Sequence, residues 1–275
     1  MSVESGISFL YEFDLGNRNI NNPGQNILSV TSTAVGDFDK ANMFKDSVRQ
    51  TWRSADVLAA QEIIIQADLS SQIDTFAILG HNFTSAAIIK VQANISNSFA
   101  APPVTITAVP ETAPDGDQNN IIIAQDFGGE YEYYKITVLD PANPCGYLEI
   151  GRIIGGRSLI LQDSEDIVDN IQIGKNDQSE KMNTEGYFRQ SNENIITRTF
   201  SSNFSKLKTV VGENTNFLAL RAMFKSVKTT RPFLTVLDRN DPSFFNMWGE
   251  LKTIPNESFG VNRYADFPIA IEEVF

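Results

Sequence analysis

The sequence predicts a mostly β protein with two domains, and two observations lead to this prediction. Between residues 63 and 150, apolar side chains recur at every second position in several segments, which is typical of strands with one buried face. Near the end of the chain, apolar residues recur instead at helical spacing in one segment. The chain has 275 residues, which suits two ordinary domains. We therefore expect a strand-rich β-sandwich followed by a smaller β domain with one α-helix.

Each alternating segment places apolar residues on one face and polar residues on the other. The predicted buried sets are Ile63, Ile65, Ala67 and Leu69; Ile89, Val91 and Ala93; Tyr134, Ile136 and Val138; and Leu148 and Ile150. A short apolar run at residues 8–15 predicts an N-terminal strand, and the four prolines of residues 99–120 restrict that segment to a sheet edge. The Gly155-Gly156 pair predicts a turn.

A change to polar and acidic composition after Gly156 places the domain boundary near Gln162. The first predicted domain is 1–162, with residues 1–40 as an N-terminal strand and arm, and the second is 163–275. The second domain should contain a strand at 195–204 and a helix over 217–227, with Asn214 or Thr215 as the N-cap. Its last strand should bury Phe267, Ile269 and Ile271.

Composition excludes several classes of function. The formal net charge of −12 and the pI of about 4.6 would repel phosphate backbones, so we expect no sequence-specific nucleic-acid binding. The single cysteine, Cys145, cannot form an intramolecular disulfide or a multi-cysteine metal site. The N-terminus lacks the basic and apolar regions of a signal peptide, and no run is long enough to span a membrane. These features predict a protein made in a reducing cytoplasm, without membrane insertion.

The sequence offers little for catalysis. His81 is the only histidine, and no nucleophile motif accompanies it. We expect His81 to end a strand and to hydrogen-bond neighbouring loops. Neighbouring carboxylates such as Glu272 and Glu273 are expected to be solvated, and Cys145 to be an inert thiol in a turn. We therefore predict no enzymatic activity and no cofactor.

Four residues are candidates for ligand binding. Trp52 and Arg53 could face a sugar, because an aromatic ring beside a guanidinium is a common recognition pair, although core packing is the competing role for Trp52. His81 and Asn82, in the segment ILGHNF, would join them if the domain acts as a lectin.

The ordered motifs WRSAD, FAILGHN, VQAN and YYKITVLDPANPCGYLEIGRI resemble a galactose-binding-like jelly roll. More narrowly, they resemble a module of tail proteins in tailed bacteriophages, over roughly half of the chain. The resemblance implies that the loop tryptophan plugs the sandwich. It also makes Asp37 and Asp39 candidates for a structural Ca²⁺, but that segment lacks the ligand density of a calcium loop, so no metal is predicted.

The second half is similar to the tail-tube and distal tail proteins of phages, through its strand, helix, PFLTVLD, WGEL and terminal IAIEE strand. The domain order is the reverse of the usual distal tail arrangement, so another minor tail component fits as well. The resemblance implies a structural virion protein that forms a ring of six subunits. It also implies contacts with tail-tube and tail hub or baseplate proteins. The alternative is a carbohydrate-binding adhesion module that recognises a host surface glycan; a glycan hydrolase is a third reading.

Overall fold

The computed structural model describes residues 6–15, 27–45, 47–67, 73–108, 110, 121–161, 167–177, 180–183, 189–192, 196–208, 215–239, 245–256, 258–259 and 264–274. The chain divides into two compact units. The sandwich unit comprises the described residues of 10–158 and 237–246, and the helical unit those of 1–9, 159–236 and 247–274.

This division differs from the expected boundary, because residues 6–9 belong to the helical unit instead of the first domain. The physical reason is aromatic packing. Phe9 is fully buried and lies edge-on to Phe204 and Phe233, with ring centroids 6.0 Å apart in both pairs. The expected boundary residue, Gln162, lies outside the described residues.

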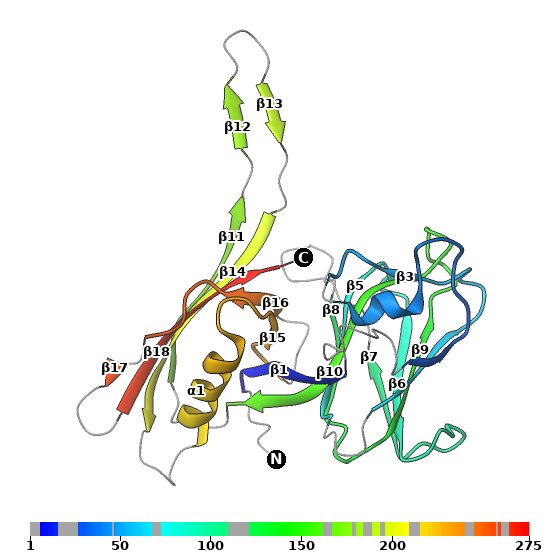
Figure 1. Ribbon diagram of the computed structural model, residues 1–275, viewed down its shortest axis with the longest axis horizontal. Helices are drawn as coiled ribbons and strands as arrows, with labels where there is room; N and C mark the ends of the chain where they lie inside the picture. Colours follow the sequence, from blue (N-terminus) through cyan, green and yellow to red (C-terminus); the bar gives the residue numbers. More distant parts are fainter. Residues whose placement is uncertain are drawn as a thin grey trace. The chain divides into compact units, whose positions relative to one another are not determined.

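The sandwich unit contains two antiparallel sheets (Figure 1). One sheet has the strand order β2-β4-β9-β6-β7, and in the other β5 lies between β8 and β10, with β3 paired to the start of β10. The strands are β2 (Ile27–Val30), β3 (Trp52–Arg53), β4 (Gln61–Gln66), β5 (Thr75–His81), β6 (Ile88–Asn94), β7 (Val104–Ala108), β8 (Ile121–Gln125), β9 (Tyr133–Leu139) and β10 (Glu149–Ile160). A short 3-10 helix, η1 (Lys40–Phe44), precedes β3.

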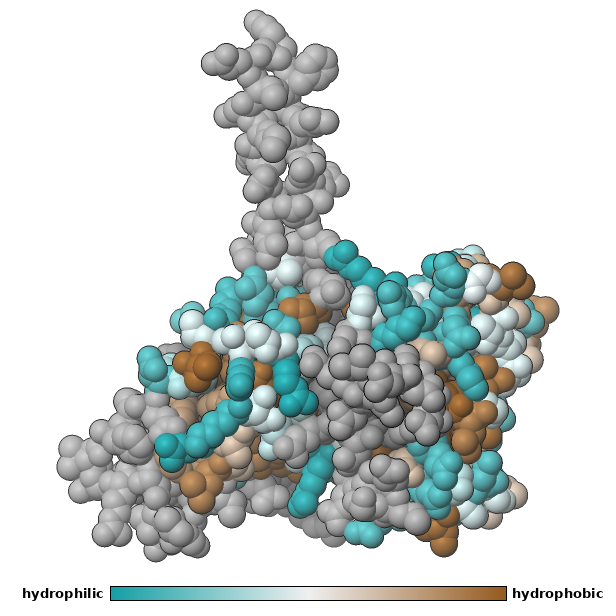
Figure 2. All heavy atoms as spheres, in the orientation of Figure 1, coloured by the Kyte–Doolittle hydropathy of each residue, from teal (hydrophilic) through white to brown (hydrophobic). Residues whose placement is uncertain are grey.

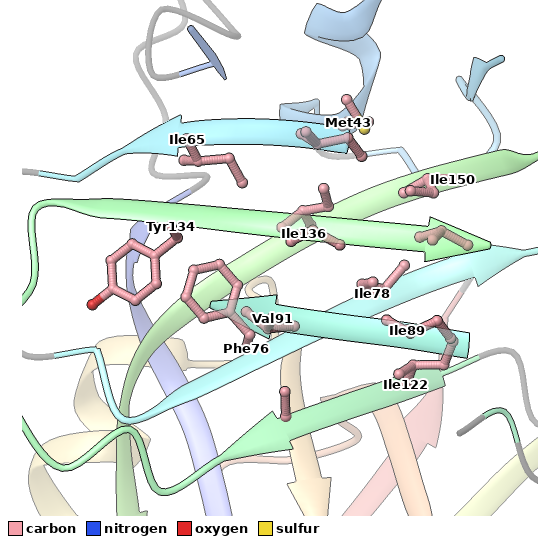
Figure 3. Packing of buried hydrophobic residues seen from close by; sticks show 14 of the residues in the cluster. Met43, Ile65, Phe76, Ile78, Ile89, Val91, Ile122, Tyr134, Ile136 and Ile150 are labelled. Carbon is pink, nitrogen blue, oxygen red and sulfur yellow. The ribbon is translucent and has the colours of Figure 1, made fainter. Parts of the chain in front are cut away.

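The core of this unit lies between the two sheets. Figure 3 shows buried side chains from both sheets in this core: Ile65, Ile89 and Ile136 come from one sheet, and Phe76 and Ile150 from the other. Burial alternates along β4 and β9, as the period of two predicted. Each isoleucine that is fully buried in such a core contributes about 1.5–3 kcal/mol to folding, so the alternation fixes which sheet face is inside.

The Gly155-Gly156 turn predicted from the sequence is wrong. Both glycines lie inside β10 and are buried, opposite Phe76 and Thr75 of β5. Neither has a positive φ, so both are extended like their neighbours. Their small size suits a strand that is buried on both faces. In the sequence alone, two adjacent glycines in such a strand look the same as two glycines in a turn.

Two other expectations for the sandwich unit are confirmed. Strand β7, which follows the first prolines of the Pro-rich segment, is an edge strand. His81 is the last residue of β5.

The helical unit is built on strands in the order β11-β14-β18-β16-β15, with β17 paired to β18. A separate ladder joins β12 to β13. The strands are β11 (Ile167–Asp177), β12 (Glu180–Asn183), β13 (Arg189–Asn192), β14 (Ile196–Lys208), β15 (Phe233–Val236), β16 (Asn246–Leu251), β17 (Ser258–Phe259) and β18 (Tyr264–Glu273). The N-terminal strand β1 (Ser8–Leu15) has the predicted bounds.

The predicted helix is α1 (Thr215–Val227). Its Phe217 and Phe224 pack against Phe267 of β18, with centroid distances of 5.4 and 5.5 Å. Thr215 is already helical, so it is not the N-cap, and Asn214 lies outside the described residues. The aromatic contacts explain why the apolar side of α1 faces the sheet.

The fold class expected from the sequence, a mostly β jelly-roll sandwich with a smaller β unit that carries one helix, is confirmed over the described residues. The coloured surface in Figure 2 mixes hydrophilic and hydrophobic side chains. Among the described residues, no helix combines the length and the apolar character that crossing a membrane requires.

Candidate functional site

Trp52 and Arg53 are neighbours in β3, and their side chains point to opposite faces because side chains alternate along a strand. Trp52 is opposite Ile150 of β10, is fully buried, and donates from Nε1 to Thr33 Oγ1 at 3.2 Å. Arg53 is opposite Glu149 and remains partly exposed. Trp52 is therefore a core residue, and Arg53 is the member of the predicted pair that reaches solvent.

The Arg53 guanidinium is held by three groups, which we call the Arg53 clamp: Phe38, Tyr147 and Glu149. The guanidinium carbon lies 4.1 Å from the ring centroid of Phe38 and 4.6 Å from that of Tyr147. Nε donates to Glu149 Oε2 at 2.7 Å. Cation–π and charge-assisted contacts of this kind fix the orientation of an arginine that would otherwise be mobile.

Phe38 reaches the clamp from the loop after β2. Ala34 N donates to Arg53 O at 2.9 Å, and Ser32 Oγ accepts from Ala55 N at 3.1 Å, so the loop runs beside β3. Gly36 has a φ of +113°, a conformation that other residues rarely adopt. It allows the sharp change of direction that precedes Phe38.

Tyr147 and Glu149 are positioned by Asn82. The Asn82 Nδ2 donates to Tyr147 O at 2.9 Å, and its Oδ1 accepts from Glu149 N at 2.8 Å. Asn82 was predicted as a possible ligand-binding residue, but both ends of its amide are used within the protein. Its role in the site is to position the clamp.

A buried hydrogen-bond network, which we call the Asn82–Asp140 network, holds the segment that contains Asn82. Asp140 is almost fully buried and accepts from Thr84 N at 2.8 Å and from Thr84 Oγ1 at 2.7 Å. Asn143 Nδ2 donates to Asp140 Oδ2 at 3.1 Å and to Asn82 O at 2.9 Å. Hydrogen bonds from several donors compensate the burial of this carboxylate, and they join the loop after β5 to the loop after β9.

His81 does not belong to the clamp. It is buried, its Nδ1 accepts from Phe83 N at 3.1 Å, and its ring stacks on Phe83 with a centroid distance of 4.7 Å. This is the structural role at a strand end that the sequence predicted, and it removes His81 from the candidate ligand-binding residues.

The candidate calcium ligands serve a different purpose. Asp39 is the N-cap of η1, where its Oδ1 accepts from Ala41 N at 2.7 Å. The Asp37 carbonyl oxygen accepts from Asn42 Nδ2 at 2.7 Å. Within the described part of the chain, no cluster of three or more His, Cys, Asp or Glu side chains could hold a metal ion.

The clamp leaves hydrogen-bonding capacity unused. Within the described residues, the terminal nitrogens of Arg53 have no protein partner, because its contacts are those to Glu149 and to the two rings. Val35 and Leu58, on the loops that precede and follow Arg53, are 99% and 84% exposed. Fixed N–H donors, with accessible apolar side chains on the adjoining loops, are suited to a ligand with hydroxyl groups and an apolar face.

Sequence reasoning found Arg53 but missed Phe38, Tyr147 and Glu149. Glu149 lies 96 residues from Arg53 in the chain, and only the pairing of β3 with β10 brings them together. The available signal was the alternation in GYLEI, which places Tyr147 and Glu149 on the face opposite to Leu148 and Ile150.

No family model and no curated protein matches this chain. Solved structures do match, each over about half of it. The third CBM32 module of a family 31 glycoside hydrolase from Clostridium perfringens is 17% identical, with a TM-score of 0.39, over 48% of this chain and 90% of that module. The lectin domain of lectinolysin, solved with Lewis B antigen, is 11% identical, with a TM-score of 0.37, over 52% of this chain and 99% of that domain.

A protein of another kind matches equally well. XRCC1, solved with the catalytic domain of DNA polymerase β, is 17% identical, with a TM-score of 0.37, over 48% of this chain and 94% of that one. Likenesses at this level do not assign a function to the chain.

Proposed function

We propose that the protein is a non-enzymatic binding protein whose sandwich unit recognises a neutral glycan through the Arg53 clamp. The observation that supports this proposal is a guanidinium packed against the rings of Phe38 and Tyr147, on a partly exposed side chain whose terminal nitrogens bond no described residue. Orienting these donors before binding lowers the entropy cost of binding a sugar hydroxyl.

Charge favours a neutral ligand over an acidic one. Glu149 already pairs with Arg53, and the exposed Asp37 and Asp56 lie on the loops that flank it. The whole chain carries a formal charge of −12, which would repel an anion during approach. Sugar hydroxyls can accept from the guanidinium without adding negative charge, and Val35 and Leu58 can contact the C–H face of the ring.

The absence of catalysis is part of the proposal. The single histidine of the chain, His81, is buried at the end of β5 and uses Nδ1 to accept from Phe83 N. A general base or a charge-relay histidine must be able to reach the substrate. We therefore expect no release of reducing ends when the protein is incubated with polysaccharides that it binds.

The experiment is a binding screen of the full chain against immobilised neutral and acidic oligosaccharides, followed by titration of the best ligand. Arg53→Met, which keeps much of the apolar stem, should weaken binding about 10- to 100-fold by removing charged hydrogen bonds. Arg157→Met is the matched control, because Arg157 is exposed and lies outside the clamp. Equal affinity of the two variants, or no neutral glycan bound by the native protein, would contradict the proposal.

A second candidate function, a structural component of a bacteriophage tail, is favoured by a different observation. Strand β11 is at the end of its sheet and exposes Ile171 and Ile173, which are 46% and 50% accessible. Exposed β-branched residues on an unpaired edge favour pairing with another chain. In this proposal, copies form a ring about the tail axis through residues 164–275 and contact neighbouring tail-tube and hub proteins.

This second proposal is tested on purified virions. A cryo-electron microscopy map should show a closed ring of copies whose contacts include β11, and Ile173→Lys should prevent its assembly. A single copy bound off the tail axis, or a ring held only by residues 41–156, would contradict it.

A further inference from the structure

The helical unit contains a pocket of about 490 Å³ that the proposed glycan site does not involve. Strands β11, β14 and β18 provide one wall through their side chains, and the segment after β16 provides the other. The lining residues used below are Gln172, Ser201, Asn203, Asn256, Ile254 and Pro268. A volume of this size is within the range of pockets that bind small ligands.

Strand register brings the polar residues together. Gln172 of β11 pairs with Ser201 of β14, and Ser201 pairs with Ala270 of β18, so these three residues form a row across the sheet. Asn203 is two residues beyond Ser201 and is therefore on the same face, opposite Pro268. The opposite face carries Phe200, Phe204 and Phe267, which are buried. Because the aromatic residues occupy the inner face, the amides and hydroxyl groups face outward into the pocket.

The second wall comes from residues 253–256. Lys252 N donates to Ala270 O at 2.9 Å, which holds the start of this segment against β18. Ile254 is 56% exposed, and Pro255 and Asn256 follow it in the lining. The pocket thus has an apolar side next to its amides.

Three side-chain amides of the pocket are available to a ligand. Among the described residues, no hydrogen bond involves the side-chain amides of Gln172, Asn203 or Asn256. Of the lining residues that the structure describes, none is charged. Lys252, which precedes the lining residue Thr253, pairs with Glu272 at 3.4 Å. A charged ligand would find no counter-ion among these lining residues, whereas amides both donate to and accept from hydroxyl groups.

We propose that this pocket binds a neutral sugar ring, a hexose or an N-acetylhexosamine. The amides of Gln172, Asn203 and Asn256 hydrogen-bond the ring hydroxyls, and Ile254 and Pro268 contact its C–H face. The protein then has a second glycan site in the helical unit, which does not depend on the Arg53 clamp. Two separate sites in one chain would increase avidity for a long glycan.

The test uses the full chain with Arg53→Met, so that binding at the clamp does not contribute. Glucose, galactose, mannose and N-acetylglucosamine are each titrated while ¹⁵N NMR follows the side-chain amide signals. At least one sugar should shift the signals of Gln172 and Asn203, which are assigned by their loss in Gln172→Leu and Asn203→Leu. Each of these substitutions should lower the affinity for that sugar about five- to tenfold, the effect of losing one or two hydrogen bonds.

Asn97→Leu is the matched control, because Asn97 is an exposed amide of the sandwich unit, and it should leave the affinity unchanged. A thermal melt of each variant shows whether it is folded, and Asn203→Asp provides a variant of nearly unchanged shape. The proposal is overturned if no sugar of the panel shifts the two amide signals. It is also overturned if Asn203→Leu and Asn203→Asp both bind as tightly as the parent, or if only an uncharged peptide amide such as N-acetylprolinamide binds.

Discussion

The Asn82–Asp140 network and the Arg53 clamp are neighbouring polar clusters with opposite properties. In the network, Asp140 and Asn143 are buried, and their polar groups bond within the protein. In the clamp, Arg53 is fixed by Glu149 and two rings, but its side chain is partly exposed and its terminal nitrogens bond no described residue. A buried polar group must be paired within the protein, whereas a partly paired group at the surface can bind a ligand at little desolvation cost. The network therefore positions the segment that carries the clamp, and the clamp is the group that we propose to bind the glycan.

The core beneath both clusters should give the largest effect. Trp52→Ala should lower the free energy of unfolding by about 3–5 kcal/mol, because a fully buried tryptophan leaves a large cavity. Urea denaturation measures this change. Leu58→Ala, at an 84% exposed position, should change stability by less than about 0.5 kcal/mol. An unchanged melting temperature for Trp52→Ala together with lost glycan binding would instead make Trp52 a ligand-binding residue.

Removal of the network's acceptor comes next. Asp140→Ala should lower the free energy of unfolding by about 2–4 kcal/mol, because Thr84 N and Asn143 Nδ2 lose their buried acceptor. It should also weaken glycan binding, since the loop that carries Tyr147 loses its anchor. Asp37→Ala removes an exposed carboxylate and is the control. Wild-type stability of Asp140→Ala would show that the network does not anchor this loop.

Asn82 separates positioning from folding. Asn82→Ala should cost about 1–3 kcal/mol in stability and reduce glycan affinity, because Tyr147 O and Glu149 N both lose their partner. Asn82→Asp keeps an acceptor for Glu149 N and should recover part of both losses. Denaturation and glycan titration of the two variants measure these effects. If both variants bind the glycan as tightly as the native protein, Asn82 does not belong to the site.

The smallest effect on stability should come from the clamp itself. Arg53→Met should change the free energy of unfolding by less than about 1 kcal/mol, because a partly exposed ion pair contributes little. The loss should appear in binding, as a lower affinity with an unchanged melting temperature. A large loss of stability in this variant would show that the clamp is mainly a structural feature.

The comparison also shows what sequence can predict. Alternation of apolar residues predicted the inner faces of β4, β6 and β9, because burial of one sheet face imposes a period of two. The same rule predicts that the side chains of Trp52 and Arg53 point to opposite faces of the strand. Gly155-Gly156 was misread as a turn because an extended, buried glycine pair has the composition of a turn.

The partners of each site residue could not be predicted in the same way. Phe38 and Glu149 meet Arg53 only through strand pairing and loop contacts across distant segments. The pocket of the helical unit depends on the register of Gln172, Ser201 and Ala270, and a shift of one residue would turn these side chains to the other face. This register cannot be derived from a single sequence, since many strand pairings satisfy the same alternation of apolar residues.

The clamp can be tested most directly by observing the Arg53 guanidinium while a glycan binds. Because Nε donates to Glu149 at 2.7 Å, its N–H signal should be protected from exchange and visible in ¹⁵N NMR, and its loss in Arg53→Met assigns it. Addition of a bound neutral oligosaccharide should shift this signal and leave the Arg157 signal unchanged. A glycan that binds the full chain without shifting the Arg53 signal would contradict the assignment of the clamp as the glycan site.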